Sequence, residues 1–229
     1  MTLNPTAVDE HRITLANGYA VRIRSLRRGE EGAVRELCAR LSLRTRHLRF
    51  FLPMPVLPDS LLRMLADVDD PRRLAFVAEL DAADGGDVVA LGNIGIDEDD
   101  RAEVGLVVAD AWQRQGIGLA LAATLLKAAE LRGYHRFVVH GLLDNPALRP
   151  LLKHVAHVVS ATTRLGEAEI AFVRRRPVEV STNAFRCLVE ATAEGEAVYN
   201  ASRELKLPAS DSQELAYERM LAFLKPGGF

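Results

Sequence analysis

The stretch Ala102–Ala120, AEVGLVVADAWQRQGIGLA, decides the fold. Its apolar run at 103–108 predicts a strand. The loop that follows contains Gly116 and Gly118, and apolar residues at helical spacing continue from there to Arg132. Such glycines let the backbone approach a ligand closely, and the free N–H groups of a first helical turn form a site for a phosphate. The stretch therefore predicts a strand, an anion-binding loop and a helix in succession.

Two other phosphate-binding motifs do not fit this loop. No lysine follows its second glycine, which a Walker A loop requires, and the loop lacks the three-glycine spacing of a dinucleotide fingerprint. The plain alternative is a tight strand-to-helix turn that binds no ligand, and it stays open at this point.

Short strands with short connections surround this unit, which predicts an antiparallel meander followed by a βα unit. Asn17-Gly18 predicts a two-residue type I′ hairpin turn, and Asn145-Pro146 predicts the cap and first residue of a helix whose second turn Pro150 disturbs. Strands are expected within 11–26 and at 73–80, 88–97, 103–108, 136–142, 155–162 and 167–174, and helices at 28–43, 44–51 (a short turn), 59–65 and 117–132.

Composition describes an ordinary globular protein. The 229 residues are 48% hydrophobic and 26% charged, and the formal net charge is -2. Near-neutrality gives no global field that would draw the protein to nucleic acid or to an anionic membrane. The two cysteines are too few for a disulfide framework, and no apolar leader or membrane-spanning run is present, so we expect a cytoplasmic location. No metal site is predicted, because the i, i+3 pair His154 and His157 has no further ligands nearby.

The loop Gln113-Arg114-Gln115-Gly116-Ile117-Gly118, set between a strand and a helix, resembles the acetyl-CoA pyrophosphate loop of the GNAT superfamily of N-acetyltransferases. The stretch Leu41–Phe51, LSLRTRHLRFF, is similar to Pat-type bacterial protein lysine acetyltransferases. The resemblance covers about residues 15–175. It implies the α/β GNAT fold, with a mixed, mostly antiparallel central sheet flanked by helices. The acetyltransferase domain is expected at 1–176 and a helical C-terminal extension, for packing or homodimerisation, at 177–229.

The resemblance also implies roles for individual residues. Glu103 would be the general base, Asn145 would touch the cofactor arm near the thioester, and backbone N–H groups near Val107 would polarise the thioester carbonyl. The pantetheine arm would pair with the backbone of Leu106, Val107 and Val108, and the pyrophosphate would bind to the residues of the loop and the first helical turn, which are Gln113, Arg114, Gln115, Gly116, Ile117, Gly118 and Leu119.

The implied reaction is direct transfer of an acetyl group from acetyl-CoA to a primary amine, with a protein lysine as the acceptor. A lysine is mostly ammonium at pH 7, and its free amine costs about 4.6 kcal/mol to present. A glutamate whose pKa is raised by partial burial can remove that proton. The alternative for Glu103 is a solvated or salt-bridged strand residue.

The sequence departs from the family where a general acid is often found. Leu152 stands where many members carry tyrosine, so no general acid is assigned. Two other functions therefore stay open: acetyl transfer to a small-molecule amine, and a catalytically silent acyl-CoA-binding module. The residues Arg46, Arg49, Phe50 and Phe51 are candidates for substrate contact, with the core as the alternative for both phenylalanines.

Overall fold

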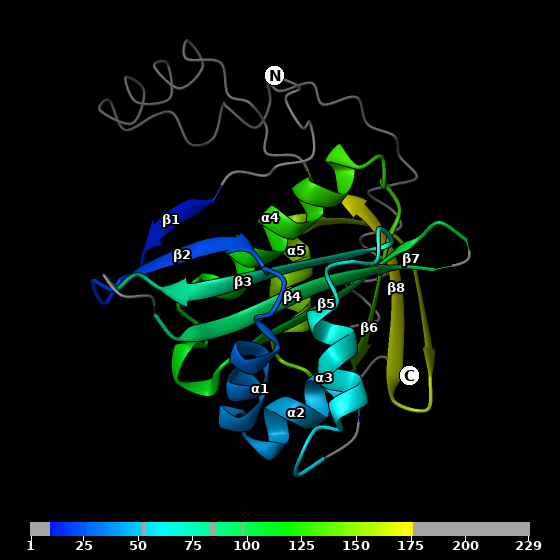
Figure 1. Cartoon of the computed structure of the whole chain (residues 1–229). Coiled ribbons are helices and arrows are strands. Elements are labelled where there is room, and N and C mark those ends of the chain that lie inside the picture. The colour runs from blue at the N-terminus through cyan, green and yellow to red at the C-terminus, as the bar shows by residue number, and fades with distance from the viewer. Residues whose placement is uncertain (1–9, 52–53, 83–85, 98, 176–229) are drawn as a thin grey trace, which may run out of the picture.

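A computed structural model describes residues 10–51, 54–82, 86–97 and 99–175 (Figure 1). The expected domain boundary at 176 and the extension at 177–229 lie outside the described residues. The strands are β1 (His11–Thr14), β2 (Ala20–Ser25), β3 (Arg73–Leu80), β4 (Val88–Ile96), β5 (Ala102–Val108), β6 (Phe137–Leu142), β7 (Ala156–Arg164) and β8 (Glu167–Arg174). The helices are α1 (Glu31–Arg40), α2 (Leu43–Phe50), α3 (Asp59–Ala66), the 3₁₀ turn η1 (Asp110–Trp112), α4 (Ile117–Leu131) and α5 (Leu148–Val155).

The described strands form one mixed sheet of eight, in the order β1-β2-β3-β4-β5-β6-β8-β7. β1 to β5 pair antiparallel in chain order. The connections from β1 to β2 and from β3 through β5 are short, as predicted, whereas α1, α2 and α3 lie between β2 and β3. α4 connects β5 to β6, which run parallel, and β8 pairs antiparallel with both β6 and β7. The predicted fold class, a mixed and mostly antiparallel sheet flanked by helices, is therefore confirmed.

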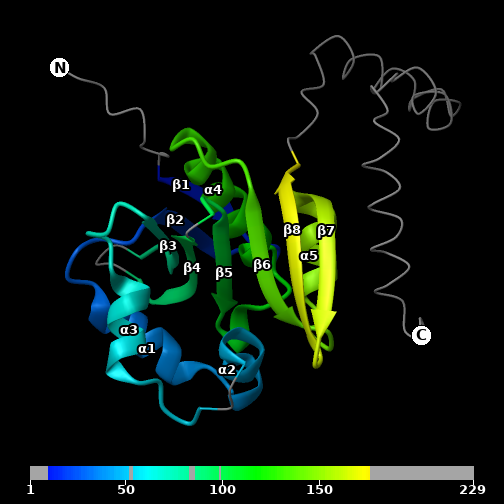
Figure 2. The ribbon, with the colours of Figure 1, turned by 90° about the vertical axis from the view of Figure 1, so that its right-hand side faces the viewer.

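The two parallel strands separate soon after they start. Their pairing consists of Ala102 with Phe137 and Glu103 with Val138. From residue 104 onward β5 pairs with β4 alone among the described strands, and Figure 2 shows β5 and β6 diverging toward their C-terminal ends. The sheet is thus open at its centre, on the side where the 113–118 loop begins.

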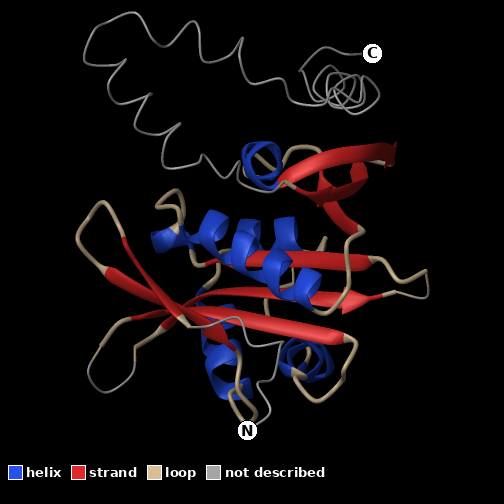
Figure 3. Cartoon of the chain, turned by 90° about the horizontal axis from the view of Figure 1, so that it is seen from above, coloured by secondary structure: helices blue, strands red, loops and turns tan. Residues whose placement is uncertain are grey.

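Helices cover both faces of the sheet (Figure 3). On one face α4 and α5 pack on a core that includes Ile117, Leu121 and Phe137. On the other face α1 and α3 pack on a second core that includes Leu37, Leu62 and Leu91. Alternation along β5 sends Val107 into this second core, whereas Leu106 and Val108 pack against the first. The two cores hold β5 firmly between them.

The predicted helix at 28–43 ends earlier than its apolar spacing indicated. α1 stops at Arg40, and Leu41 is extended with ψ 140°. Ser42 then caps α2, because its side chain accepts a hydrogen bond from Thr45 N. The segment at 44–51, expected to be a short helical turn, is therefore a separate helix of two turns.

Two local predictions at turns were wrong. A type I′ turn needs a positive φ at both Asn17 and Gly18, but in the β1–β2 turn only Gly18 has one, of 87°. The Gly18 N–H donates instead to Leu15 O, and Leu15 N donates to Tyr19 O. α5 begins at Leu148 with Ala147 as its cap, and the side chain of Asn145 instead accepts from Ala147 N. Pro150 consequently lies in the first turn, where a missing N–H costs no helical bond.

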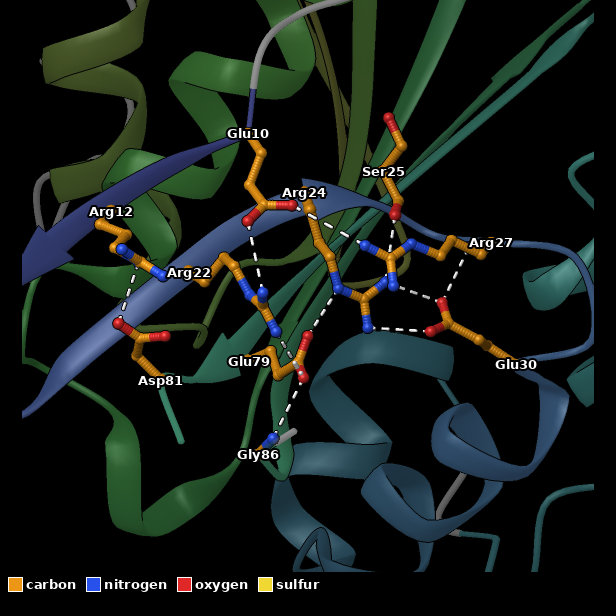
Figure 4. Close-up of polar contacts among 10 residues, drawn as sticks. All are labelled: Glu10, Arg12, Arg22, Arg24, Ser25, Arg27, Glu30, Glu79, Asp81 and Gly86. Atoms are coloured by element: carbon orange, nitrogen blue, oxygen red, sulfur yellow. Dashed lines mark hydrogen bonds and ion pairs between the residues drawn. The ribbon is translucent and has the colours of Figure 1, made fainter. Parts of the chain in front are cut away.

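An ion network joins β2, β3 and the start of α1 (Figure 4). Arg22 and Arg24 alternate with Val21 and Ile23 along β2, a sequence pattern that predicts a half-buried strand with both arginines on its polar face, yet Arg24 is only 6% exposed. Its Nε donates to Glu79 Oε2 at 2.6 Å, and its two terminal nitrogens bind both oxygens of Glu30. Arg22 Nη2 also donates to Glu79, at 3.1 Å. The network ties the N-terminus of α1 to the sheet.

We expect acid to unfold the protein partly through this network. Burial opposes ionisation of Glu79 and Glu30. Hydrogen bonds from Arg24 and from backbone N–H groups, together with the attraction of nearby arginines, outweigh burial and hold the pKa of both carboxyls below the ordinary glutamate value. Groups with a depressed folded-state pKa stabilise the protein above the unfolded value, about 4.3, and that stability is lost as the pH falls through the folded value. Thermal unfolding between pH 7 and pH 3 should show a melting temperature that falls below about pH 4.5. A melting temperature that holds or rises in acid would contradict this.

Candidate functional site

A cavity of about 700 Å³ lies at the open centre of the sheet. Its walls come from β5, the 113–118 loop, the first turn of α4, and the sides of α2 and α5. Of the residues predicted for the cofactor, nine line it, and they are Leu106, Val107, Val108, Gln113, Arg114, Gly116, Gly118, Leu119 and Asn145. Segments far apart in the sequence are thus brought together around one space.

The glycine loop has the geometry of an anion site. Gly116 is in the left-handed region with φ 89°, and a Cβ there would meet nothing within 4 Å. It precedes α4 without a side-chain cap, so the first N–H groups of α4 have no side-chain partner at the N-cap. These N–H groups and the helix dipole favour a bound anion. At Gly118 a Cβ would lie 3.5 Å from the side chains of Leu106 and Val108, an ordinary packing distance, so the first turn of α4 packs directly on β5.

The polar side chains of the loop have different roles. Gln113 Nε2 donates to Val108 O at 3.0 Å and so fixes the loop to the end of β5. Gln115 faces away from the cavity, where it accepts from Asn17 Nδ2 at 2.7 Å and donates to Ala111 O. The Ile117 side chain is fully buried in the core. Gln115 and Ile117 can therefore reach a ligand only through their backbone, while Arg114 lines the cavity.

The register of β5 shows which backbone groups face the gap. Ala109 N donates to Val89 O of β4, and Ala102 N donates to Arg136 O beside β6. Because these directions alternate along a strand, the N–H of Val107 points toward β4, and those of Leu106 and Val108 point toward the gap. The backbone donors available to a ligand near Val107 are therefore those of its two neighbours.

Glu103 is exposed and lies where the parallel pairing ends, opposite Gly95 of β4 and Val138 of β6. It does not line the cavity itself. It shares a face of β5 with Gly105 and Val107, as the strand period predicts. The carboxylate is thus placed at the edge of the gap, open to solvent.

Arg49 reaches the same face of β5 from α2. Its Nη2 donates to Asn93 Oδ1 at 2.8 Å, and a Cβ on Gly105 would overlap this nitrogen. Burial lowers the pKa of the Arg49 guanidinium, and the attraction of Glu103 opposes that shift. A positive charge therefore lies between the proposed base and Val107, in the wall of the cavity.

A hydrogen-bonded clamp holds α2 in this place. Asp110 accepts from Ser42 N at 2.9 Å, from Ser42 Oγ at 2.6 Å and from Thr45 Oγ1 at 2.7 Å. Burial opposes its ionisation, but the bonds from Ser42 and Thr45 keep the pKa of Asp110 below its ordinary value. Gln113 Nε2 also donates to Thr45 Oγ1. The loop and the helix that carries Arg49 are thus directly joined.

On the opposite wall, α5 presents Pro150, Leu151 and His154 to the cavity. His154 Nδ1 lies 2.7 Å from Pro150 O, which can only accept, so Nδ1 carries the proton and Nε2 is left for other partners. Leu152 is 3% exposed and faces the core. The position where the family often has tyrosine therefore does not reach the cavity in this chain.

Of the four candidates in Leu41–Phe51, Arg49 alone has its side chain in the cavity wall. Arg46 donates instead to the carbonyl oxygens of Ala39, Met54 and Pro55, and Phe50 packs against the second core. The cavity is also lined by Thr45, Trp112 and Pro150, which were not predicted as lining residues. Only the spacing of Thr45 and Arg49, one helical turn apart, indicates a shared helix face. Within the described ranges, no group of three metal-ligating side chains is present. The part of the chain that the structure describes has no helix long and apolar enough to cross a bilayer.

Comparisons with known proteins agree with this geometry. Residues 42–156 match the Acetyltransferase (GNAT) family. A Pseudomonas aeruginosa acetyltransferase, PA5475, is 31% identical over 144 residues, which are 60% of this chain and 75% of that protein. The GNAT domain of S. lividans PAT has a TM-score of 0.64 at 20% identity and covers 76% of this chain and 99% of its own. Mycobacterium smegmatis RimJ, solved with CoA-disulfide, has a TM-score of 0.56 at 22% identity over 82% of this chain and 96% of its own. The two structures support the fold, and the sequence matches show that the chain belongs to the acetyltransferase (GNAT) family.

Proposed function

We propose that this protein transfers an acetyl group from acetyl-CoA directly to the side-chain amine of a protein lysine, with Glu103 as the general base. The observation that carries the proposal is a cavity that connects the start of α4, which has no side-chain cap, with the gap beside β5. Acetyl-CoA is an extended substrate, and its pyrophosphate would bind at the loop while its thioester lies at the gap. The exposed position of Glu103 suits an acceptor at the tip of a long side chain.

The proposed chemistry divides among few groups. Glu103 takes a proton from the lysine ammonium, directly or through a water, and the free amine attacks the thioester carbon. The C–N bond forms as the C–S bond breaks, and the second amine proton leaves to solvent. The N–H groups of Leu106 and Val108 face the position where negative charge develops on the carbonyl oxygen. The CoA thiolate is a good leaving group, with a thiol pKa of about 8.5, so it needs no strong acid.

The burial of Leu152 favours a second candidate, an acyl-CoA-binding module without turnover. Both functions predict that acetyl-CoA binds, so turnover separates them. The test is incubation of the purified full chain with acetyl-CoA and, in parallel, with lysine-bearing cellular proteins and with small amines, followed by mass spectrometry and thiol detection. Acetylated lysine with thiol release supports the proposal. Acetylation of small amines alone would show that the acceptor is a small amine and not a protein lysine. Binding of acetyl-CoA without thiol release would show that the protein is an acyl-CoA-binding module without turnover.

Replacing Gly116 with valine should lower the affinity for acetyl-CoA by about 10-fold or more. A β-branched residue is strained in the left-handed region, and its side chain enters the space beside the first N–H groups of α4. Calorimetric titration measures the affinity.

Gly133→Val is the matched control for this change. Gly133, just beyond the other end of α4, has φ 90° and an equally open Cβ position. The control should lose comparable stability and keep its affinity. Equal affinity in Gly116→Val and wild type would remove the loop from the binding site.

A further inference from the structure

We infer that Arg49 recognises a carboxylate carried by the substrates, close to the carbonyl that reacts. The inference rests on the proposed function and names a substrate class for the same site. The carboxylate has two possible sources: the far end of a dicarboxylic acyl group on CoA, or an acidic group next to the amine of the acceptor.

The charge of Arg49 has no carboxylate within ion-pair distance among the described residues. Its hydrogen bond goes to the neutral amide of Asn93, and its guanidinium carbon lies 5.2 Å from the centre of the Phe50 ring, which attracts a cation without neutralising its charge. Glu103 acts on it only through longer-range attraction. A guanidinium that has lost part of its hydration is normally compensated by an anion. Arg24 in the same fold shows the contrast, because two carboxylates bind it directly.

Two N–H donor groups of Arg49 are available to a ligand. Nη2 is used by Asn93, whereas Nε and Nη1 have no partner among the described residues and are not among the buried unpaired atoms. Arg49 lies in the cavity wall, so a ligand in the cavity can approach this guanidinium. A guanidinium presents its nitrogens as a planar fork that matches a carboxylate, and it stays charged at any physiological pH.

The distance from Arg49 to the reacting groups also fits a carboxylate on the substrate. Residues on one face of a strand are about 6.6 Å apart, so a group over Gly105 lies about that far from the positions of both Glu103 and Val107. A carboxylate two or three bonds from the reacting carbon, with one hydrogen bond added, spans a comparable distance. Arg49 is also held rigidly, because the Asp110 clamp fixes the start of its helix. The guanidinium is therefore placed before the substrates arrive.

The donor arm of the test measures binding and needs no acceptor. Calorimetry compares succinyl-CoA with butyryl-CoA, which has the same chain length without the carboxylate, and with acetyl-CoA. If the acyl group supplies the carboxylate, the wild type binds succinyl-CoA about 10-fold or more tighter than butyryl-CoA, the strength of one charged hydrogen-bonded contact.

The acceptor arm measures kcat/KM for acetyl transfer to paired acceptors. One pair is a lysine peptide with aspartate or asparagine beside the lysine, and the other is a free amino acid and its carboxamide. If the acceptor supplies the carboxylate, the acidic member of each pair is preferred by a similar factor, of about 10-fold.

Three variants make both arms specific to Arg49. Arg49→Gln should reduce the preference to about one, and Arg49→Lys, which keeps the charge without the fork, should reduce it in part. Arg44→Gln is the matched control, because Arg44 is exposed on the same helix and does not line the cavity. Circular dichroism confirms that each variant is folded.

The outcomes separate this inference from the proposed function. An Arg49-dependent preference in either arm supports the inference and identifies the source of the carboxylate. Acetyl-CoA binding or transfer with no such preference in either arm overturns the inference and leaves the proposed function standing. Failure of the wild type to bind any acyl-CoA overturns both.

Discussion

Replacement of Glu103 by glutamine should lower kcat for acetyl transfer by about 100-fold or more, while the affinity for acetyl-CoA changes little. Glutamine keeps the shape of the side chain and cannot accept the amine proton. Glu103 lies outside the cavity wall, at the edge of the gap, so its loss removes proton transfer and leaves the cofactor contacts in place. Steady-state thiol release gives kcat, and calorimetry gives the affinity.

Glu167→Gln is the control for this variant. Glu167 is an exposed strand glutamate at the start of β8, and its replacement should leave both quantities unchanged. A Glu103→Gln enzyme with wild-type kcat would show that the amine loses its proton to another group. A parallel loss of affinity would indicate that Glu103 holds the shape of the gap.

The second large effect is on stability. Glu79→Gln should reduce the free energy of unfolding by about 3 kcal/mol, because it leaves Arg24 buried with half of its charge compensation. Arg24 and Glu79 are each 6% exposed at the side chain, and Figure 4 shows Glu79 bound by Arg22, Arg24 and the Gly86 N–H. Urea unfolding measures the change.

A surface ion pair provides the comparison. Arg101 and Glu169 lie 3.2 Å apart with side chains 35% and 42% exposed, so Glu169→Gln should cost under about 1 kcal/mol. If Glu79→Gln costs no more than Glu169→Gln, the network does not hold α1 on the sheet. The double variant Arg24→Met, Glu79→Leu should be less unstable than the two single changes added together, since no unpaired charge stays buried.

The parts of the site that are continuous in sequence could be predicted from it. The strand, loop and helix within Ala102–Ala120 are set by local signals, namely an apolar run, two glycines and helical spacing. The hairpin of β1 and β2 and the meander of β3 to β5 followed from short connections. These signals and Asn145 predicted one ligand site, and most of the residues predicted for it line the cavity.

The parts that depend on tertiary contacts could not be predicted. Arg49 reaches Gly105 from α2, and the start of that helix is held by hydrogen bonds between Ser42 and Asp110, which lie 68 positions apart. The direction of the β5 backbone donors depends on register with β4. Arg24 looked like a surface residue because its partner Glu79 lies on another strand. In each case the deciding partner is distant in sequence.

A crystal structure of the full chain with CoA would show the proposed binding mode directly. We predict the pyrophosphate on the first N–H groups of α4 beside Gly116, the pantetheine arm in the gap between β5 and β6, and the sulfur between Leu106 and Asn145 on the side of Glu103. CoA bound elsewhere on the chain, or a sulfur that lies on the far side of the sheet from Glu103, would contradict it.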